Sequence, residues 1–242
     1  MGVPPGLSDR QWPITRATTP RKRCQTATII SGATTSLCEY SRHIRGREAV
    51  SWQPRSMQPP PRITLPTVLL RDDELALRPW QLDDAPARVL AGADPAICRW
   101  TSVQRGADLA AARAWITHSH ASREAGEALH LALIVDEQCV GGVGLFDVVQ
   151  RHRRAEVGYW LLPEARGHNY VVRAVRALSE WAFSSLALNR LDLYTNIDNE
   201  SSMRAAEKAG FSREALLRQW YLGEDGPEDL ILFGLVRPEA TR

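Results

Sequence analysis

The sequence predicts an α/β fold, in which helices flank both faces of a mixed, mostly antiparallel sheet. Two observations support this prediction. Along residues 63–242, apolar residues alternate over short segments and recur at helical spacing over longer ones. A helical segment over 170–185 also separates two strand-like segments, and a helical crossover between strands of one sheet makes them parallel. The order of the predicted elements is strand, two helices, three strands, helix, strand, helix and two strands, which indicates a sheet with one parallel crossover.

The first predicted elements are a strand and two helices. Leu75, Leu77 and Pro79 alternate along the chain, which indicates a strand that ends in a turn. Residues 83–93 predict a short helix capped by Asp83 or Asp84. Residues 107–126 predict a second helix, whose buried face carries Leu109, Ala112, Trp115 and Ile116.

The remaining strands and helices lie between residues 129 and 236. Residues 129–149 predict a hairpin that turns at Asp136-Glu137-Gln138. The elements that follow are a strand over 153–162, a helix over 170–185, a strand over 190–197, a helix ended by Gly210 as its C-terminal cap, and strands over 214–222 and 228–236. A ligand is expected at the crossover, because strand ends and a helix amino terminus meet there.

The start of the crossover helix has features of a phosphate site. The first turn of a helix has unpaired N–H groups and the positive end of the helix dipole, which suit a pyrophosphate. Gly167 allows close approach of the backbone, and Arg166 adds positive charge. The alternative is an ordinary strand-to-helix loop that contains a glycine.

Residues 1–62 differ in composition from the rest of the chain. They contain ten Arg/Lys against three Asp/Glu and eight of the fifteen prolines, which predicts a basic, disordered extension before a domain over 63–242. The extension could be a nucleic-acid-binding arm or an organelle presequence, although Arg outnumbers Lys 28 to 2 in the whole chain. A third hypothesis is that translation normally starts near Met57.

Several other classes of protein are not indicated. No apolar run has the length of a membrane span. The four cysteines are scattered without a C-x-x-C pair, which favours a reducing, cytoplasmic setting and no structural metal. His118 and His120 are two residues apart on a predicted helix, so they do not share a face as a metal pair would.

Four segments in a fixed order carry a resemblance to a known family. They are LALRPWQLDDA (75–85), AEVGYWLLPEARGHNYVVRAVRAL (155–178), NESSMRAAEKAGF (199–211) and GPEDLILFGLV (226–236). The second resembles the acyl-CoA-binding motif of the GNAT superfamily of N-acyltransferases, and the third resembles a motif of its RimJ/RimL-like, ribosomal-protein N-acetyltransferase branch. The resemblance spans roughly residues 66 to 238. It implies a GNAT-like fold and acetyl-CoA as co-substrate.

The same resemblance implies the residues that contact acetyl-CoA. They are Trp160, Leu161, Leu162, Arg166, Gly167, His168, Asn169, Tyr170, Val171, Asn199 and Ser202. The chain departs from the family pattern where Asn169 replaces a glycine and Val171 replaces an alanine. Asn tolerates left-handed backbone angles better than other residues with side chains, so we expect the turn to form.

Two residues are candidates for the chemistry of acyl transfer. Glu156 lies on the strand before the turn and could accept the amine proton, directly or through water. Ser202 resembles the family's serine near the CoA sulfur and could donate to the departing thiolate. The alternatives are a solvent-facing carboxylate for Glu156 and, for Ser202, merely the third residue of a helix capped by Asn199. The resemblance also implies that the strand over Glu156 to Leu162 bulges away from its neighbour and supplies an oxyanion donor from the backbone N–H groups near Trp160 to Leu162.

The sequence therefore predicts an acetyl-CoA-dependent N-acetyltransferase that acts on a primary amine, either a protein N-terminus or a small molecule. An α-amino group has a pKa of about 8 against about 10.4 for lysine, so it loses its proton more easily. Trp100, Trp220, Tyr221 and Asp229 are candidates to face the acceptor. The rival hypothesis is a non-catalytic acyl-CoA-binding module in which Asn169 marks lost turnover. Both a monomer and a homodimer are compatible with the sequence.

Overall fold

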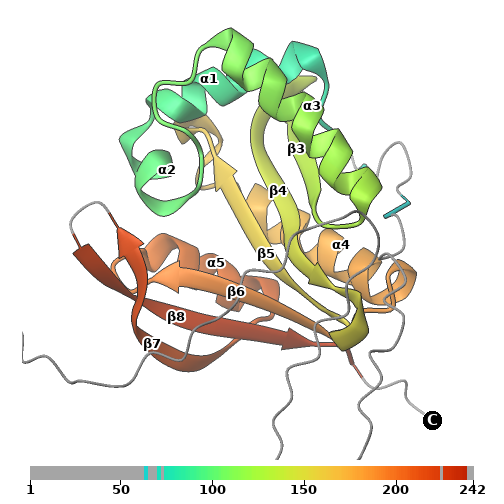
Figure 1. Ribbon diagram of the computed structural model, residues 1–242, viewed down its shortest axis with the longest axis vertical. Helices are drawn as coiled ribbons and strands as arrows, with labels where there is room; N and C mark the ends of the chain where they lie inside the picture. Colours follow the sequence, from blue (N-terminus) through green and yellow to red (C-terminus); the bar gives the residue numbers. More distant parts are fainter. Residues whose placement is uncertain (1–62, 65–69, 72–73, 224–225, 239–242) are drawn as a thin grey trace, which may run out of the picture. The chain divides into compact units, whose positions relative to one another are not determined.

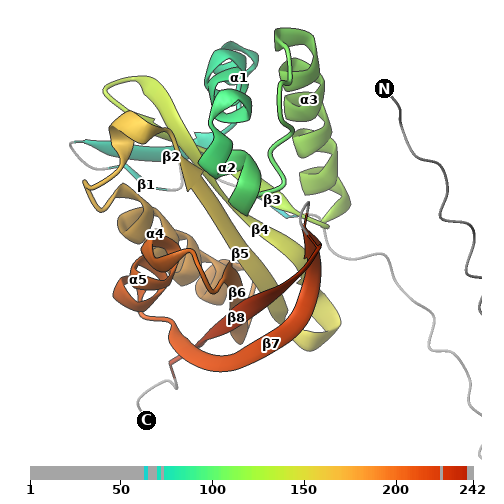
Figure 2. The same cartoon turned by 90° about the vertical axis from the view of Figure 1, so that its left-hand side faces the viewer.

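A computed structural model describes residues 63–64, 70–71, 74–223 and 226–238 (Figures 1 and 2). The predicted extension over 1–62, with the hypothetical start at Met57, lies outside the described residues. Among those described, no helix is both long and apolar enough to cross a membrane.

The described strands form one sheet of eight, in the order β1-β2-β3-β4-β5-β6-β8-β7. Their bounds are β1 Leu70–Arg71, β2 Leu75–Pro79, β3 Leu129–Val135, β4 Gln138–Val149, β5 Arg154–Leu161, β6 Arg190–Asn196, β7 Ser212–Gly223 and β8 Gly226–Val236. Only the β5–β6 pairing is parallel among these. The predicted mixed sheet with one crossover is confirmed.

Helices cover both faces of the sheet. Their bounds are α1 Ala85–Ala93, α2 Pro95–Trp100, α3 Leu109–Ala125, α4 Tyr170–Ser185 and α5 Glu200–Ala209, and short 3-10 turns occupy Leu82–Asp84, Gln150–His152 and Pro163–Ala165. Helices α1 to α3 lie over one face, and α4 and α5 lie side by side over the other (Figures 1 and 2). We call these the α1–α3 face and the α4–α5 face.

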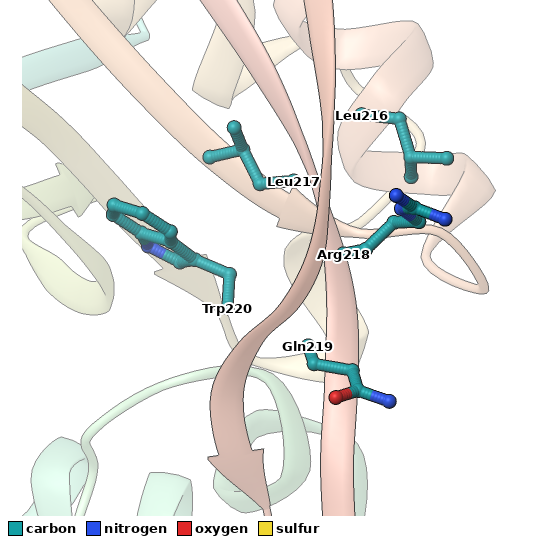
Figure 3. A pocket seen from close by; sticks show the side chains of 5 residues that line it. All are labelled: Leu216, Leu217, Arg218, Gln219 and Trp220. Atoms are coloured by element: carbon teal, nitrogen blue, oxygen red, sulfur yellow. The ribbon is translucent and has the colours of Figure 1, made fainter.

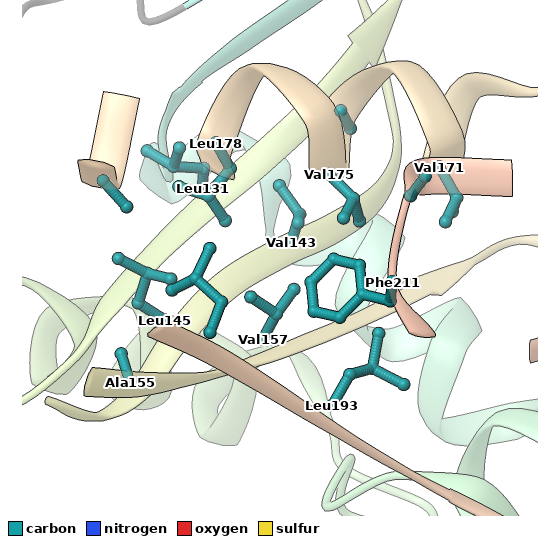
Figure 4. Close-up of a cluster of buried hydrophobic side chains, with 14 of the residues drawn as sticks. Leu131, Val143, Leu145, Ala155, Val157, Val171, Val175, Leu178, Leu193 and Phe211 are labelled. Carbon is teal, nitrogen blue, oxygen red and sulfur yellow. The ribbon is translucent and has the colours of Figure 1, made fainter. Parts of the chain in front are cut away.

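The main core lies between the sheet and α4 (Figure 4). The predicted apolar face of α4 packs into this core, through Val171, Ala174, Val175, Leu178, Trp181 and Ala182. Because strand side chains alternate, Ala155 and Val157 of β5 enter the same core, whereas Trp160 packs on the α1–α3 face. Successive residues of β5 therefore serve opposite faces of the sheet.

Some local predictions are wrong. Helix α2 was not predicted, although Asp94 caps it and Pro95 starts it. Asp84 is the N-cap residue of α1, as one of the two predicted choices, but its side chain makes no capping hydrogen bond to that helix; the carboxylate instead accepts hydrogen bonds from Arg78 and from the N–H of Gln81. A charged partner on the preceding strand is a stronger donor than a helix N–H.

The second predicted helix and the hairpin turn also differ in detail. Leu109 starts α3 with 41% of its surface exposed, so the buried face begins at Ala112. The hairpin turn consists of Asp136 and Glu137, both at positive φ, and Gln138 already belongs to β4.

Candidate functional site

Strands β5 and β6 diverge shortly after they meet (Figure 1). As far as the structure describes the chain, they pair through three residue pairs, between Arg154–Glu156 and Arg190–Asp192. Beyond them, β5 stays with β4, and β6 stays with β8. We call this divergence the fork. Backbone groups that would complete a sheet ladder are left facing the fork instead.

The strand edges at the fork can be assigned from hydrogen-bond alternation. The N–H of Leu162 donates to Val140 O at 2.9 Å, on the β4 side. Backbone groups alternate in direction along a strand, so those of Tyr159 and Leu161 point to the fork. Of the three residues predicted to supply an oxyanion donor, Leu161 is therefore the one whose N–H faces the fork. The side chain of Trp160 stacks on Trp80, with ring centroids 5.9 Å apart.

The predicted phosphate turn has two left-handed residues. Gly167 has φ 88° and Asn169 has φ 58°, and α4 starts at Tyr170. The Asn169 side chain makes no capping hydrogen bond to the helix in the described structure. The side chain of Val171 is buried in the core, away from the turn. A Cβ added to Gly167 would meet no described atom within 4 Å, so the turn faces open space.

Arg166 is held by two groups beside this turn. Its guanidinium donates to Asp94 Oδ2 at 2.9 Å and to Leu161 O at 3.2 Å. Burial would raise the pKa of Asp94, but the hydrogen bond from Ile97 N–H and the charge of Arg166 outweigh it and lower that pKa. The turn is thus tied to the start of α2. His168, the exposed residue between Gly167 and Asn169, stacks on Tyr170 with centroids 5.3 Å apart.

Helix α5 begins on the same face of the sheet. Asn199 caps it, since Asn199 Oδ1 accepts from Ser202 N–H at 3.1 Å. The predicted position of Ser202 as third residue of a helix capped by Asn199 is confirmed. The Ser202 hydroxyl lies 3.0 Å from the hydroxyl of Tyr159, which reaches it from β5. Tyr159 was not among the candidate residues.

Glu156 lies on the opposite face from Ser202. It is the last β5 residue paired with β6, where its partner is Asp192. Burial, with the negative charges of Asp147 and Asp192, raises the pKa of Glu156 from 4.5 to about 7. Asp192 itself is paired with Arg190 at 2.6 Å and Arg154 at 3.4 Å. Glu156 is therefore the carboxylate at the fork that can change protonation state near neutral pH.

Residues 74–212 match the model of the Acetyltransferase (GNAT) domain. The chain belongs to the GNAT acetyltransferase family. Relatives include the uncharacterized N-acetyltransferase p20 of Bacillus licheniformis, 28% identical over 70% of this chain and 97% of that protein. YoaA, an uncharacterized N-acetyltransferase, and YdaF, a putative ribosomal N-acetyltransferase, both of Bacillus subtilis, are 32% and 31% identical, over 42% and 46% of this chain. These two matches span 58% and 61% of the relatives' own lengths.

Solved structures share the fold. The microcin C7 self-immunity acetyltransferase MccE, in complex with acetyl-CoA and AMP, aligns with a TM-score of 0.64 at 20% identity over 69% of this chain and 94% of that chain. RimL, a ribosomal L7/L12 α-N-protein acetyltransferase in complex with coenzyme A, aligns with a TM-score of 0.63 at 15% identity over 70% and 97%. The predicted family and the predicted GNAT-like fold are confirmed.

The turn and fork of this GNAT domain fit a CoA group. The first turn of α4, which no side chain caps in the described structure, offers N–H donors suited to a pyrophosphate. Gly167 faces open space there. Tyr159 presents its strand N–H and C=O groups to the fork, where they could pair with the amides of pantetheine; Leu161 presents its N–H there, while its C=O accepts from Arg166. Among the described residues, no cluster of three His, Cys, Asp or Glu side chains could hold a metal ion.

The α1–α3 face of the fork carries aromatic and acidic groups beyond Glu156. Tyr194 of β6 stacks on Trp220 of β7, with centroids 6.3 Å apart. Trp220 and Leu217 lie on the same side of β7, beside a shallow concavity of about 580 Å³ (Figure 3). Glu228 of β8 accepts from Asn196 and lies 3.8 Å from Arg99.

The other candidates to face the acceptor are Trp100, Tyr221 and Asp229. Trp100 ends α2 and packs against the Arg99 guanidinium. Tyr221 is 57% exposed on β7. The Asp229 carboxylate accepts from the N–H of Gln219, so it stabilises the β7–β8 hairpin.

Proposed function

We propose that this protein transfers an acetyl group from acetyl-CoA to a primary amine by direct attack in a ternary complex. The observation that carries the proposal is the fork between β5 and β6. A carboxylate with a pKa of about 7, Glu156, lies on one face of the sheet, and the hydroxyls of Ser202 and Tyr159 lie on the other. A thioester held between the strands would have a base on one side and hydrogen-bond donors on the other.

Glu156 is the proposed proton acceptor. A carboxylate whose pKa lies near the working pH is efficient in general base catalysis, because it is ionised and still binds a proton well. The proton leaves the attacking amine, directly or through water, as the new C–N bond forms. The C–S bond then breaks, and its electron pair stays on the sulfur of CoA.

The groups proposed to bind CoA and to stabilise the developing charges lie at the fork and at the starts of α4 and α5. The N–H of Leu161 is the candidate donor to the negative charge on the carbonyl oxygen. The turn at Arg166 to Val171 would hold the pyrophosphate, with Arg166 adding charge at one side. The amide nitrogen of Asn199 could contact the pantetheine arm, since its Oδ1 is occupied as a helix cap. Ser202 would donate to the developing thiolate. Positioning of both reactants then supplies much of the rate.

The acceptor is proposed to be an α-amino group at a protein N-terminus or a small amine. The names of YdaF and RimL support the first choice, and the low pKa of an α-amino group, about 8, fits a single weak base such as Glu156. The acceptor would approach from the α1–α3 face, where Tyr194 and Trp220 lie. The rival is a non-catalytic acyl-CoA-binding module in which Asn169 marks lost turnover; the left-handed φ of 58° at Asn169 supports a formed turn.

Two measurements test this function. Calorimetric titration of the full chain with acetyl-CoA should show micromolar binding. Release of free CoA should then be followed with a panel of peptide N-termini and small amines. Glu156→Gln should lower turnover about 100-fold or more while leaving acetyl-CoA affinity unchanged. Glu180→Gln is the matched control, because Glu180 is exposed on the outer side of α4. Binding without turnover for every amine would favour the non-catalytic module.

A further inference from the structure

Tyr159 of β5 and Ser202 of α5 are joined by two contacts. The phenol oxygen of Tyr159 lies 3.0 Å from Ser202 Oγ and 3.1 Å from Ser202 O. The two residues are 43 positions apart in the chain, so the contact depends on the fold rather than on local structure. It also crosses the fork, from the strand on one side to the helix that follows the strand on the other.

The number of available hydrogens limits these contacts to two hydrogen-bond arrangements. A tyrosine has one hydroxyl hydrogen, and a backbone carbonyl only accepts. If Tyr159 donates to Ser202 O, the remaining contact is a hydrogen bond only when Ser202 Oγ donates to Tyr159. In this arrangement the serine hydrogen points to Tyr159. The reverse arrangement, Tyr159 donating to Ser202 Oγ, frees the serine hydrogen for another acceptor.

The surroundings of Tyr159 hold its ring in place and keep its hydroxyl protonated. Its ring packs against the main core, and burial raises the pKa of the phenol, so that it stays neutral. A neutral phenol with a fixed ring can exchange one acceptor for the other by rotation of a single C–O bond. A chain of hydrogen bonds also strengthens each donor along it, which makes the serine hydroxyl a better donor when Tyr159 donates to it.

We infer that Tyr159 is a positioning residue for acetyl transfer, which turns the Ser202 hydroxyl towards the departing sulfur by donating its own hydrogen to Ser202 Oγ. This inference rests on the proposed function. In the free protein, the serine hydrogen is held by Tyr159. During transfer, Tyr159 donates to Ser202, and Ser202 donates to the thiolate. No bond of Tyr159 breaks, so the proton balance of the reaction is unchanged.

Tyr159→Phe, measured in the full chain, tests the inference. The variant keeps the ring in the core and removes the hydroxyl alone. We expect kcat to fall about 10-fold, with the acetyl-CoA dissociation constant unchanged within about twofold. Ser202→Ala should lower kcat about 100-fold. In the Ser202→Ala background, adding Tyr159→Phe should have no further effect, because the residue through which Tyr159 acts is missing.

The controls separate this inference from the proposed function. Ser201→Ala removes the neighbouring hydroxyl, which donates to Asn199 Oδ1, and should leave kcat unchanged. If Ser202→Ala has full activity, the proposed role of Ser202 is wrong. If Ser202→Ala is impaired while Tyr159→Phe is not, the inference about Tyr159 is overturned. Equal factors for Tyr159→Phe in both backgrounds would also overturn it, as would a loss confined to acetyl-CoA affinity.

Discussion

Helices α4 and α5 start side by side on one face of the sheet, and each starts after an asparagine, yet the two starts are built differently (Figure 2). At α5, Asn199 has φ −91° and its side chain caps the helix. At α4, Asn169 has φ 58°, and its side chain forms no cap in the described structure. The two residues have the same side chain, so the backbone conformation of the asparagine decides whether that side chain can accept a hydrogen bond from the first N–H groups of the helix.

Under the proposed function, this difference leaves the N–H groups of the α4 start available to a ligand, whereas one N–H group of the α5 start is satisfied within the protein. A cap stabilises a helix by satisfying its first N–H groups, and the same cap would compete with a phosphate for them. The α4 start gives up that stability, and its turn faces open space at Gly167. Changes to the α4 turn should therefore lower CoA affinity more than stability, and loss of the Asn199 cap at α5 should lower stability in addition to any effect on the pantetheine contact proposed for Asn199.

Gly167→Val should have the largest effect. Gly167 has φ 88°, where a β-branched residue is strained, and the new side chain would occupy the space in front of the α4 start. We expect acetyl-CoA affinity to fall at least about 100-fold, or about 2.7 kcal/mol, in calorimetric titration.

The matched control is Gly210→Ala, at the other end of α5. Gly210 has φ 103°, so alanine there is also strained, but a Cβ would meet only Leu235 at 3.9 Å. It should lower the unfolding free energy by about 1 kcal/mol without changing acetyl-CoA affinity. Unchanged affinity in Gly167→Val would remove the α4 start from the binding site.

Glu156→Gln extends the comparison to the α1–α3 face of the sheet. Glu156 lies on that face, opposite the starts of α4 and α5. Its pKa is about 7 in the folded protein against 4.5 ordinarily, so the folded state favours the protonated form. The stability from this proton is full below pH 4.5 and is lost as pH rises through 7. Glutamine mimics the protonated form, so above pH 7 the variant should be more stable than the wild type, by about 1–3 kcal/mol.

Thermal unfolding of the wild type and of Glu156→Gln at a series of pH values tests this predicted gain in stability. The advantage of Glu156→Gln should shrink as pH falls from about 7 and disappear below about 4.5. The wild-type turnover should rise towards neutral pH as Glu156 ionises. A stability difference independent of pH would mean that Glu156 is not the titrating group.

Asn199→Ala should affect the α5 start in the opposite way to Gly167→Val. Loss of the cap should lower the free energy of unfolding by about 1 kcal/mol, measured by denaturant titration. Asn199→Asp keeps a capping oxygen and should restore most of that stability. If Asn199→Asp were as unstable as Asn199→Ala, the cap would not be the source of the stability.

Much of this architecture could be predicted from the sequence, because periodicity reports which residues are buried. The apolar spacing of α4 and the crossover around it were predicted, as was the helix that Gly210 ends. Helix α2 was missed since its six residues are too few to show a period, although Asp94-Pro95 is a start signal.

The parts that were not predicted depend on contacts between distant residues. The family resemblance implies that the strand over Glu156 to Leu162 bulges away from its neighbour, but sequence spacing does not show that its pairing with β6 ends at Glu156, or that Leu162 N–H is occupied by Val140. The Tyr159–Ser202 contact joins β5 and α5, which the fold brings together although the two residues are 43 positions apart in the sequence. The sequence does show alternation along β5, which would have placed Tyr159 on the face opposite Glu156.

Asn169→Gly should have the smallest effect. It tests whether the backbone conformation or the side chain of Asn169 determines ligand binding at the α4 start. Glycine is usual at this position in the family, but Asn169 already has the left-handed backbone that glycine would allow. We expect acetyl-CoA affinity within about twofold of wild type, and slightly lower stability because glycine has more freedom in the unfolded chain. Asn169→Ala should cost about 1 kcal/mol, since alanine tolerates this conformation less well. A large gain of affinity in Asn169→Gly alone would show that the asparagine side chain, and not the backbone, limits binding at the α4 start.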